Sequence, residues 1–210
     1  MDNSVPLSDI PHLYANEIIP YHEAGHAVMA RLYGINVEYI ELYLIVEGTY
    51  QGIYFGKTAW DRDRPIHLWD PNIPYNELGL QQGVISNIEV ALVYAAGKAA
   101  ERIWYRQRSL DETLASYGSG RDNDERQLEE VLTPPSDLSR LIPVDLPKRI
   151  QEIENKAMQL LEAKICWQAV EAIAQTLLEG LKQTPNNIML SDVQNRIADV
   201  FAQAALNEKT

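Results

Sequence analysis

The chain has 210 residues, of which 46% are hydrophobic and 23% are charged, and this balance excludes a wholly disordered protein. Acidic side chains outnumber basic ones by 30 to 18, and the resulting charge of -12 repels phosphate backbones, so nucleic acid is not an expected partner. The single cysteine, Cys166, cannot form an intrachain disulfide. We see no signal peptide and no apolar stretch of about 18 residues, and therefore expect a cytoplasmic protein without a membrane span.

The first part of the chain changes from a helical to a strand pattern. Residues 1–15 contain two prolines and predict an extended arm. Apolar residues then recur at spacings of three and four from Ile18 to Tyr33, which predicts a helix with Pro20 in its first turn. Runs of β-branched and aromatic residues on either side of Glu47-Gly48-Thr49 predict a β-hairpin over residues 36–56.

The remainder of the chain has mostly helical patterns. We expect an irregular loop over residues 59–76, in which Trp60 and Trp69 either line a peptide groove or pin the loop to the core. Apolar stripes predict helices over 78–105, 122–132, 150–161, 166–181 and 190–204. A proline-rich connector separates the second of these helices from the third. The predicted fold class is mostly α (α+β), a helix bundle with one small β-hairpin or sheet and a helical C-terminal region.

The strongest chemical signal is an HExxH motif on the first predicted helix, formed by His22, Glu23 and His26. Residues four apart on a helix face the same way, so the two imidazoles can share one metal ion, for which Zn²⁺ is the usual choice. Glu23 is turned by about 100° from the first histidine and can reach a metal-activated water without binding the metal. That is the position of a general base.

A catalytic zinc also needs a third protein ligand and an open coordination position. The chain offers His12, His67 and many carboxylates. The most suggestive source is the segment over residues 119–124, where a glycine turn leads into Asp122 and Asp124 at the start of a predicted helix.

Four stretches, taken in order, resemble the FtsH-type zinc metallopeptidases. Tyr21 to Ala27 is similar to the zinc motif of that family, and Ala96 to Glu101 resembles its Gly-Gly-Arg-Ala-Ala-Glu segment. Ser119 to Asp124 resembles its Thr-Gly-Ala-Ser-Asn-Asp segment without a gap, and the C-terminal helices resemble its helical tail. The resemblance therefore covers nearly the whole chain.

The resemblance implies a zinc-dependent endopeptidase. It implies that His22, His26 and Asp124 bind Zn²⁺, with Asp122 as the fallback for the third ligand, and that Glu23 is the catalytic base. It also implies a single FtsH-like peptidase domain over 1–210, with a zinc-site part over 1–133 and a helical part over 134–210.

The departures from the family concern how substrate is delivered. Ala96, Lys98 and Arg102 stand where the family usually has Gly, Arg and Glu. The family's enzymes also carry membrane segments and an ATPase module before the peptidase and assemble as hexameric rings, and we see neither element in this sequence. The expected partners are an unfolded polypeptide or peptide substrate, received by strand addition at the hairpin edge near residues 50–55, and a separate ATPase or further copies of the chain.

Two alternatives remain open. The first is a catalytically silent, FtsH-like binding or adaptor module, and the second is a zinc hydrolase of non-peptide amides. The intact Glu23 favours an enzyme over the silent module, because a silent homologue has no need for a general base.

Overall fold

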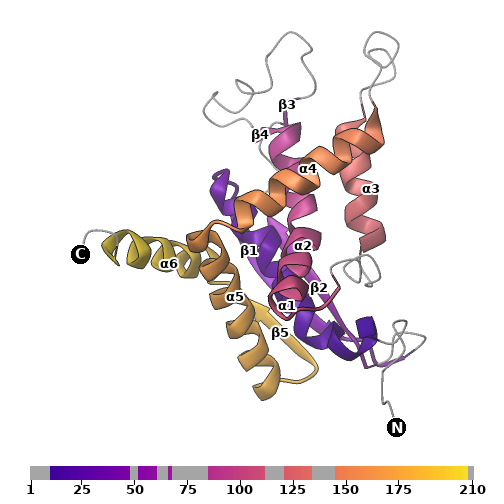
Figure 1. Cartoon of the computed structure of the whole chain (residues 1–210). Coiled ribbons are helices and arrows are strands. Elements are labelled where there is room, and N and C mark those ends of the chain that lie inside the picture. Colours follow the sequence, from indigo (N-terminus) through magenta and orange to yellow (C-terminus); the bar gives the residue numbers. More distant parts are fainter. Residues whose placement is uncertain are drawn as a thin grey trace.

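The computed structural model describes residues 10–47, 52–60, 66–67, 85–111, 121–133 and 145–207. Its helices are α1 (Ile10–Leu32), α2 (Asn87–Gln107), α3 (Arg121–Leu132), α4 (Leu146–Leu161), α5 (Lys164–Gln183) and α6 (Val193–Asn207). Its strands are β1 (Val37–Leu44), β2 (Tyr54–Trp60), β3 (Ile66–His67), β4 (Ile85–Ser86) and β5 (Asn187–Leu190). The predicted fold class, mostly helical with a small sheet, is confirmed (Figure 1).

Helix α1 is longer than its apolar stripe predicts. Residues 10–15, predicted as part of an extended arm, are helical, and residues 1–9 lie outside the described part of the chain. Pro20 is therefore inside the helix and not in its first turn. A proline there offers no N–H to the carbonyl of Asn16, one turn earlier. The side chain of Asn16 bonds to the hairpin: it donates to the Gly52 carbonyl at 3.2 Å and accepts from the Tyr54 N–H at 3.1 Å.

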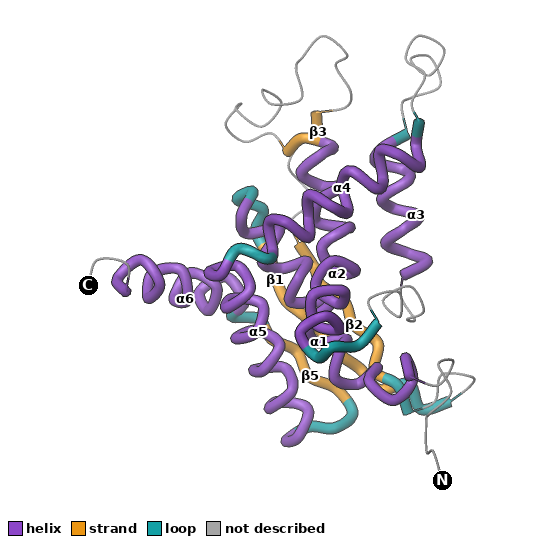
Figure 2. The backbone as a smooth tube through the Cα atoms, in the orientation of Figure 1, coloured by secondary structure: helices purple, strands orange, loops and turns teal. Residues whose placement is uncertain are grey.

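The β-hairpin is confirmed, with its second strand later than predicted. Strand β2 begins at Tyr54 and not near residue 50, and it pairs antiparallel with β1. A third strand joins the other side of β1 from far along the chain, giving the order β2-β1-β5 (Figure 2). Strand β5 was not predicted, and its last residue, Leu190, was expected in the final helix, which begins at Val193. Leu190 pairs with Ile40, and both side chains are buried.

Helix α2 is buried along nearly all of its length, between α1 on one side and α3 and α4 on the other. The predicted start near residue 78 lies outside the described residues, and the helix begins at Asn87, directly after β4. The crossing of α1 over α2 depends on Gly25, inside the HExxH motif. A Cβ at Gly25 would stand 2.6 Å from the carbonyl oxygen of Ala96, so only glycine permits the two backbones to approach so closely.

The C-terminal helices complete the core. Helix α4 begins after Asp145, whose side chain accepts the Lys148 N–H at 3.2 Å as an N-cap. Helix α5 packs on α1 and α6, and α6 extends away from the other helices (Figure 1). Buried residues from the two predicted parts of the domain, 1–133 and 134–210, belong to one cluster. Among the described residues, no helix is both long and apolar enough to cross a membrane.

Candidate metal centre

The HExxH motif lies in the most deeply buried stretch of α1. Between Ile18 and Ala30 almost every side chain is shielded from solvent, and the motif residues are no exception, with exposed fractions of 8% for His22, 5% for Glu23 and 3% for His26. Polar side chains are not buried without partners, because the loss of hydration costs more than burial returns. The partners of these three side chains therefore indicate what the site does.

Each imidazole is oriented by a hydrogen bond at its Nδ1 atom. Nδ1 of His22 lies 2.7 Å from Oε1 of Glu101, and Nδ1 of His26 lies 2.6 Å from the carbonyl oxygen of Val93. A carbonyl oxygen and an ionised carboxylate only accept hydrogen bonds, so both Nδ1 atoms must carry the proton and donate. In neutral imidazoles this leaves both Nε2 atoms with a lone pair, which is the form that binds metal ions.

These two lone pairs face each other and a carboxylate. The Nε2 atoms of His22 and His26 lie 3.0 Å apart, and α3 brings Oδ2 of Asp124 to 3.0 Å from the first and 3.2 Å from the second. Three acceptor atoms at this spacing repel one another unless a cation, a proton or a metal ion, lies among them. Ligand atoms about 2.0–2.2 Å from a tetrahedral zinc are roughly 3.3–3.6 Å apart, so an outward shift of a few tenths of an ångström would fit the three atoms around such an ion.

Asp124 is suited to remain ionised in this position. Its burial alone raises the pKa of the carboxyl, because the charged form is poorly solvated. When the two imidazoles carry protons at Nε2 in place of a metal ion, the positive charge of His26, the hydrogen bonds from His22 and His26 and the positive charge of His22 act in the opposite direction, and together they hold the pKa of Asp124 well below its usual value. The carboxylate is thus available as a ligand at neutral pH.

The side chain of Glu23 contacts strand β2, whereas those of His22 and His26 contact α2 and α3. Its Oε2 accepts a hydrogen bond of 2.6 Å from the hydroxyl of Thr58, which also lies 3.1 Å from the Glu23 backbone carbonyl oxygen. Gly56, two residues earlier on β2, leaves the room that the Glu23 side chain occupies, because a Cβ there would overlap it. Strand β2 therefore holds the carboxylate of the proposed base.

Gly97 provides the same kind of room on the α2 side. A Cβ at this position would stand 2.5 Å from Cε1 of His22 and from Nε2 of His26. No side chain larger than hydrogen fits there without moving an imidazole. The glycine of the Ala96–Glu101 stretch is thus required by the site itself.

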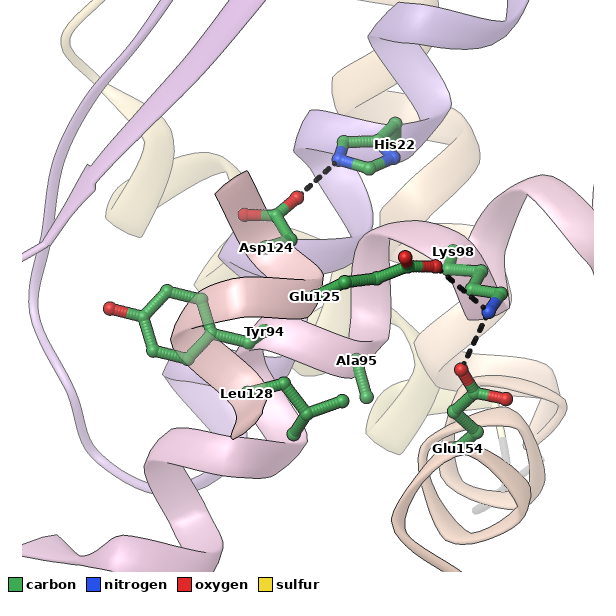
Figure 3. A pocket seen from close by; sticks show the side chains of 8 residues that line it. All are labelled: His22, Tyr94, Ala95, Lys98, Asp124, Glu125, Leu128 and Glu154. Atoms are coloured by element: carbon green, nitrogen blue, oxygen red, sulfur yellow. Dashed lines mark hydrogen bonds and ion pairs between the residues drawn. The ribbon is translucent and has the colours of Figure 1, made fainter. Parts of the chain in front are cut away.

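The surroundings of the site combine aromatic rings and a partly buried ion pair. Trp60 packs against the ring of His26, with centroids 6.1 Å apart, and edge-on against Tyr94 at 5.3 Å. Lys98 binds Glu154 of α4 at 2.7 Å and Glu125 of α3 at 3.2 Å. These contacts tie α2, α3 and α4 together directly beside Asp124 (Figure 3). A small pocket lies here, lined by His22, Tyr94, Ala95, Lys98, Asp124, Glu125, Leu128 and Glu154.

The structure brings together the residues that the sequence analysis selected. His22, His26 and Asp124 form a group whose ligand atoms all lie within 4.8 Å of one another. Asp122, the fallback ligand, is in α3, while His12 is in α1 and His67 in β3, and the side chains of these three lie outside the described set.

Glu101 and Thr58 were not predicted to have a role, although both are buried and bond to the motif. Glu101 lies four residues after Gly97, one helical turn along α2, and this spacing was a usable signal. Thr58 had no signal in the sequence. It lies near the end of β2, two residues before Trp60, and only the packing of β2 on α1 brings it to Glu23.

No protein-family model matches this chain, and no curated protein matches it. The case for a metal centre therefore rests on the donor atoms described above.

Proposed function

We propose that the chain is a zinc-dependent endopeptidase of the FtsH-like kind. The observation that carries the proposal is the meeting of three acceptor atoms, Nε2 of His22, Nε2 of His26 and Oδ2 of Asp124, at separations of 3.0–3.2 Å. Both imidazoles are oriented so that these atoms are lone-pair donors to a cation.

The donor set fits Zn²⁺ better than other common cations. Two imidazole nitrogens and one carboxylate oxygen are typical zinc ligands, whereas Mg²⁺ and Ca²⁺ prefer oxygen ligands alone. Three protein ligands also leave one position for water or substrate, which is the pattern of catalytic zinc sites. Zinc bound there supplies Lewis-acid chemistry, lowering the pKa of water and polarising the scissile carbonyl.

Glu23 is the residue that moves protons in this proposal. It accepts the proton of the attacking water and passes it to the nitrogen of the leaving amine. Because its carboxylate is buried and bonded to Thr58, it is held in one orientation on the helix that carries the two histidines. His22, His26 and Asp124 do not transfer protons, since their lone pairs are used on the metal.

The sheet offers a binding mode for an extended polypeptide. Strand β2 is at one edge of the sheet, and none of the described strands pairs with it on the side away from β1. A peptide added there would lie along the strand that holds Glu23, and its backbone would supply the hydrogen bonds of strand addition. Unfolded polypeptide is therefore the proposed substrate. We further propose that a separate ATPase or a homo-oligomer delivers it, and that the protein acts in the cytoplasm.

The test combines elemental analysis with cleavage of unfolded α-casein. We expect about one zinc per wild-type chain, and cleavage that a chelator stops and added zinc restores. Glu23→Gln keeps the ligands and the size of the side chain, so it should bind zinc and lose cleavage.

Each contrary result points to another reading. A wild-type protein that binds zinc but leaves casein intact would favour the silent binding or adaptor module. Cleavage of small amides but not of casein would favour an amide hydrolase. Wild-type cleavage rates in Glu23→Gln would remove the general-base role.

A further inference from the structure

Strand β2 has two roles that meet at one residue. Its outer edge is where a peptide would add, and two of its side-chain positions, Gly56 and Thr58, face Glu23 on α1. We infer that Thr58 is a positioning residue, whose hydroxyl holds the Glu23 carboxylate in place and ties it to the strand that receives substrate. This inference rests on the proposed peptidase function and deepens it.

The contact is built for one orientation of the carboxylate. Thr58 is 8% exposed and Glu23 is 5% exposed, so water does not substitute freely for the hydrogen bond between them. The 2.6 Å separation of Oγ1 and Oε2 is typical of a bond from a hydroxyl to an ionised carboxylate. The same hydroxyl lies 3.1 Å from the Glu23 carbonyl oxygen, which fixes the side chain and backbone of Glu23 against one atom.

Gly56 is a second point at which β2 is matched to Glu23, apart from the hydrogen bond of Thr58. Any side chain at Gly56 would occupy the space of the Glu23 carboxyl group. The strand therefore has an empty position and a donor two residues apart, on the same face, and both are matched to one carboxylate.

The backbone of Thr58 belongs to the substrate edge. Tyr54 gives its N–H to Asn16 and not to β1, and alternate residues of a strand direct their backbone groups to the same side. The register from Leu44–Tyr54 to Ile40–Thr58 is unbroken, so Gly56 and Thr58 direct their N–H and C=O groups away from β1. A peptide paired with this edge would be in a fixed register with the base that Thr58 holds.

A misplaced base slows the chemical step without weakening the binding of substrate. Thr58→Val removes the hydroxyl and keeps a β-branched shape suited to a strand. We expect its kcat on fluorescein-labelled casein to fall about 10- to 100-fold, with KM and zinc content close to those of the wild type. Thr58→Ser retains a hydroxyl and should recover most of the lost rate.

A matched control is available on α5. The hydroxyl of Thr176 donates to the Ala172 carbonyl at 2.9 Å, within its own helix. Thr176→Val makes the same chemical change away from the site and should leave kcat and KM unchanged. A fall in kcat in Thr58→Val that Thr58→Ser does not recover, or that Thr176→Val shares, would show a general packing effect and overturn the inference.

A measurement that needs no activity separates this inference from the proposed function. In protein labelled with ¹³C at the glutamate carboxyl, the Glu23 resonance is identified by its loss in Glu23→Gln. We expect that resonance to shift in Thr58→Val and to stay near its wild-type position in Thr58→Ser. An identical resonance in the wild type, Thr58→Val and Thr58→Ser would refute the Thr58–Glu23 contact, even if casein is cleaved. A shifted resonance in a zinc-loaded protein that cleaves nothing would instead refute the peptidase assignment, and with it the catalytic meaning of the contact.

Discussion

The Cα atom of Gly97 faces His26 so closely that a methyl carbon attached to it would stand 2.5 Å from Nε2, the atom that would bind the metal. This relationship makes Gly97→Ala an informative variant. Alanine is favoured over glycine in a helix interior by about 1 kcal/mol, so α2 itself should not be weakened. The added methyl group must instead displace an imidazole.

We therefore expect Gly97→Ala to fold and to lose most of its zinc. Circular dichroism checks the helix content and elemental analysis the metal. A variant that retained one zinc per chain would show that the ligand atoms are not where the structure places them.

The third ligand can be tested with two neighbouring carboxylates of α3. Asp124→Asn removes the charge from the Oδ2 atom that lies 3.0 Å from Nε2 of His22, and keeps the size of the side chain. We expect zinc binding to fall by at least about 100-fold, because a neutral amide is a poor replacement for a carboxylate ligand. Asp122→Asn is the matched control and should retain zinc. The reverse result would make Asp122 the ligand.

Glu101 should act on the metal through His22. Its Oε1 accepts the Nδ1–H of that histidine at 2.7 Å, which fixes both the tautomer and the ring orientation. Glu101→Gln weakens this acceptor and should lower zinc affinity about 10- to 100-fold, measured by competition with a chromophoric chelator. Glu125→Gln, at an exposed carboxylate bonded to Lys98, is the control and should bind zinc normally. Equal affinities in the two variants would argue against a role for Glu101.

Two buried groups predict a loss of stability in alkaline solution. Burial raises the pKa of the Cys166 thiol above its ordinary value of 9.0. Burial, followed by the nearby Tyr14, raises the pKa of Tyr105 above 10.0. The folded protein thus keeps protons that the unfolded chain releases, so the free energy of unfolding is unaffected below the unfolded pKa values and falls as pH rises through them.

The free energy of unfolding can be measured with urea from about pH 7 to 10, and we expect it to begin to fall near pH 9. Cys166→Ala should make the decline shallower. The buried thiol should also resist iodoacetamide in the native protein and react once the chain is unfolded. Rapid alkylation of the folded protein would contradict both expectations.

The part of the site that the sequence could predict is local. His22 and His26 are four residues apart on a segment with a helical pattern, and helix geometry alone places their side chains together. Asp124 was reached through a motif resemblance and not through local geometry, since 98 residues separate it from His26. Its closeness depends on α3 packing against α2, which no local pattern describes.

The errors in the fold have the same physical origin. Pro20 usually marks a helix start, and the helix continues through it because tertiary burial of α1 outweighs one lost hydrogen bond. Strand β5 is four residues long, and its last residue, Leu190, was assigned to a helix. Only pairing with β1, as of Asn187 with Tyr43 far earlier in the chain, makes this segment a strand.

By itself the sequence determined which helices form, which faces they bury and that two histidines and a glutamate share one turn, because these depend on periods of three to four residues. Tertiary structure decided which carboxylate meets the histidines, which glycines leave room for them, and that Thr58 holds Glu23. Those contacts join segments 35 to 102 residues apart in the chain. Their formation depends on the packing of whole elements, which the spacing of neighbouring residues does not encode.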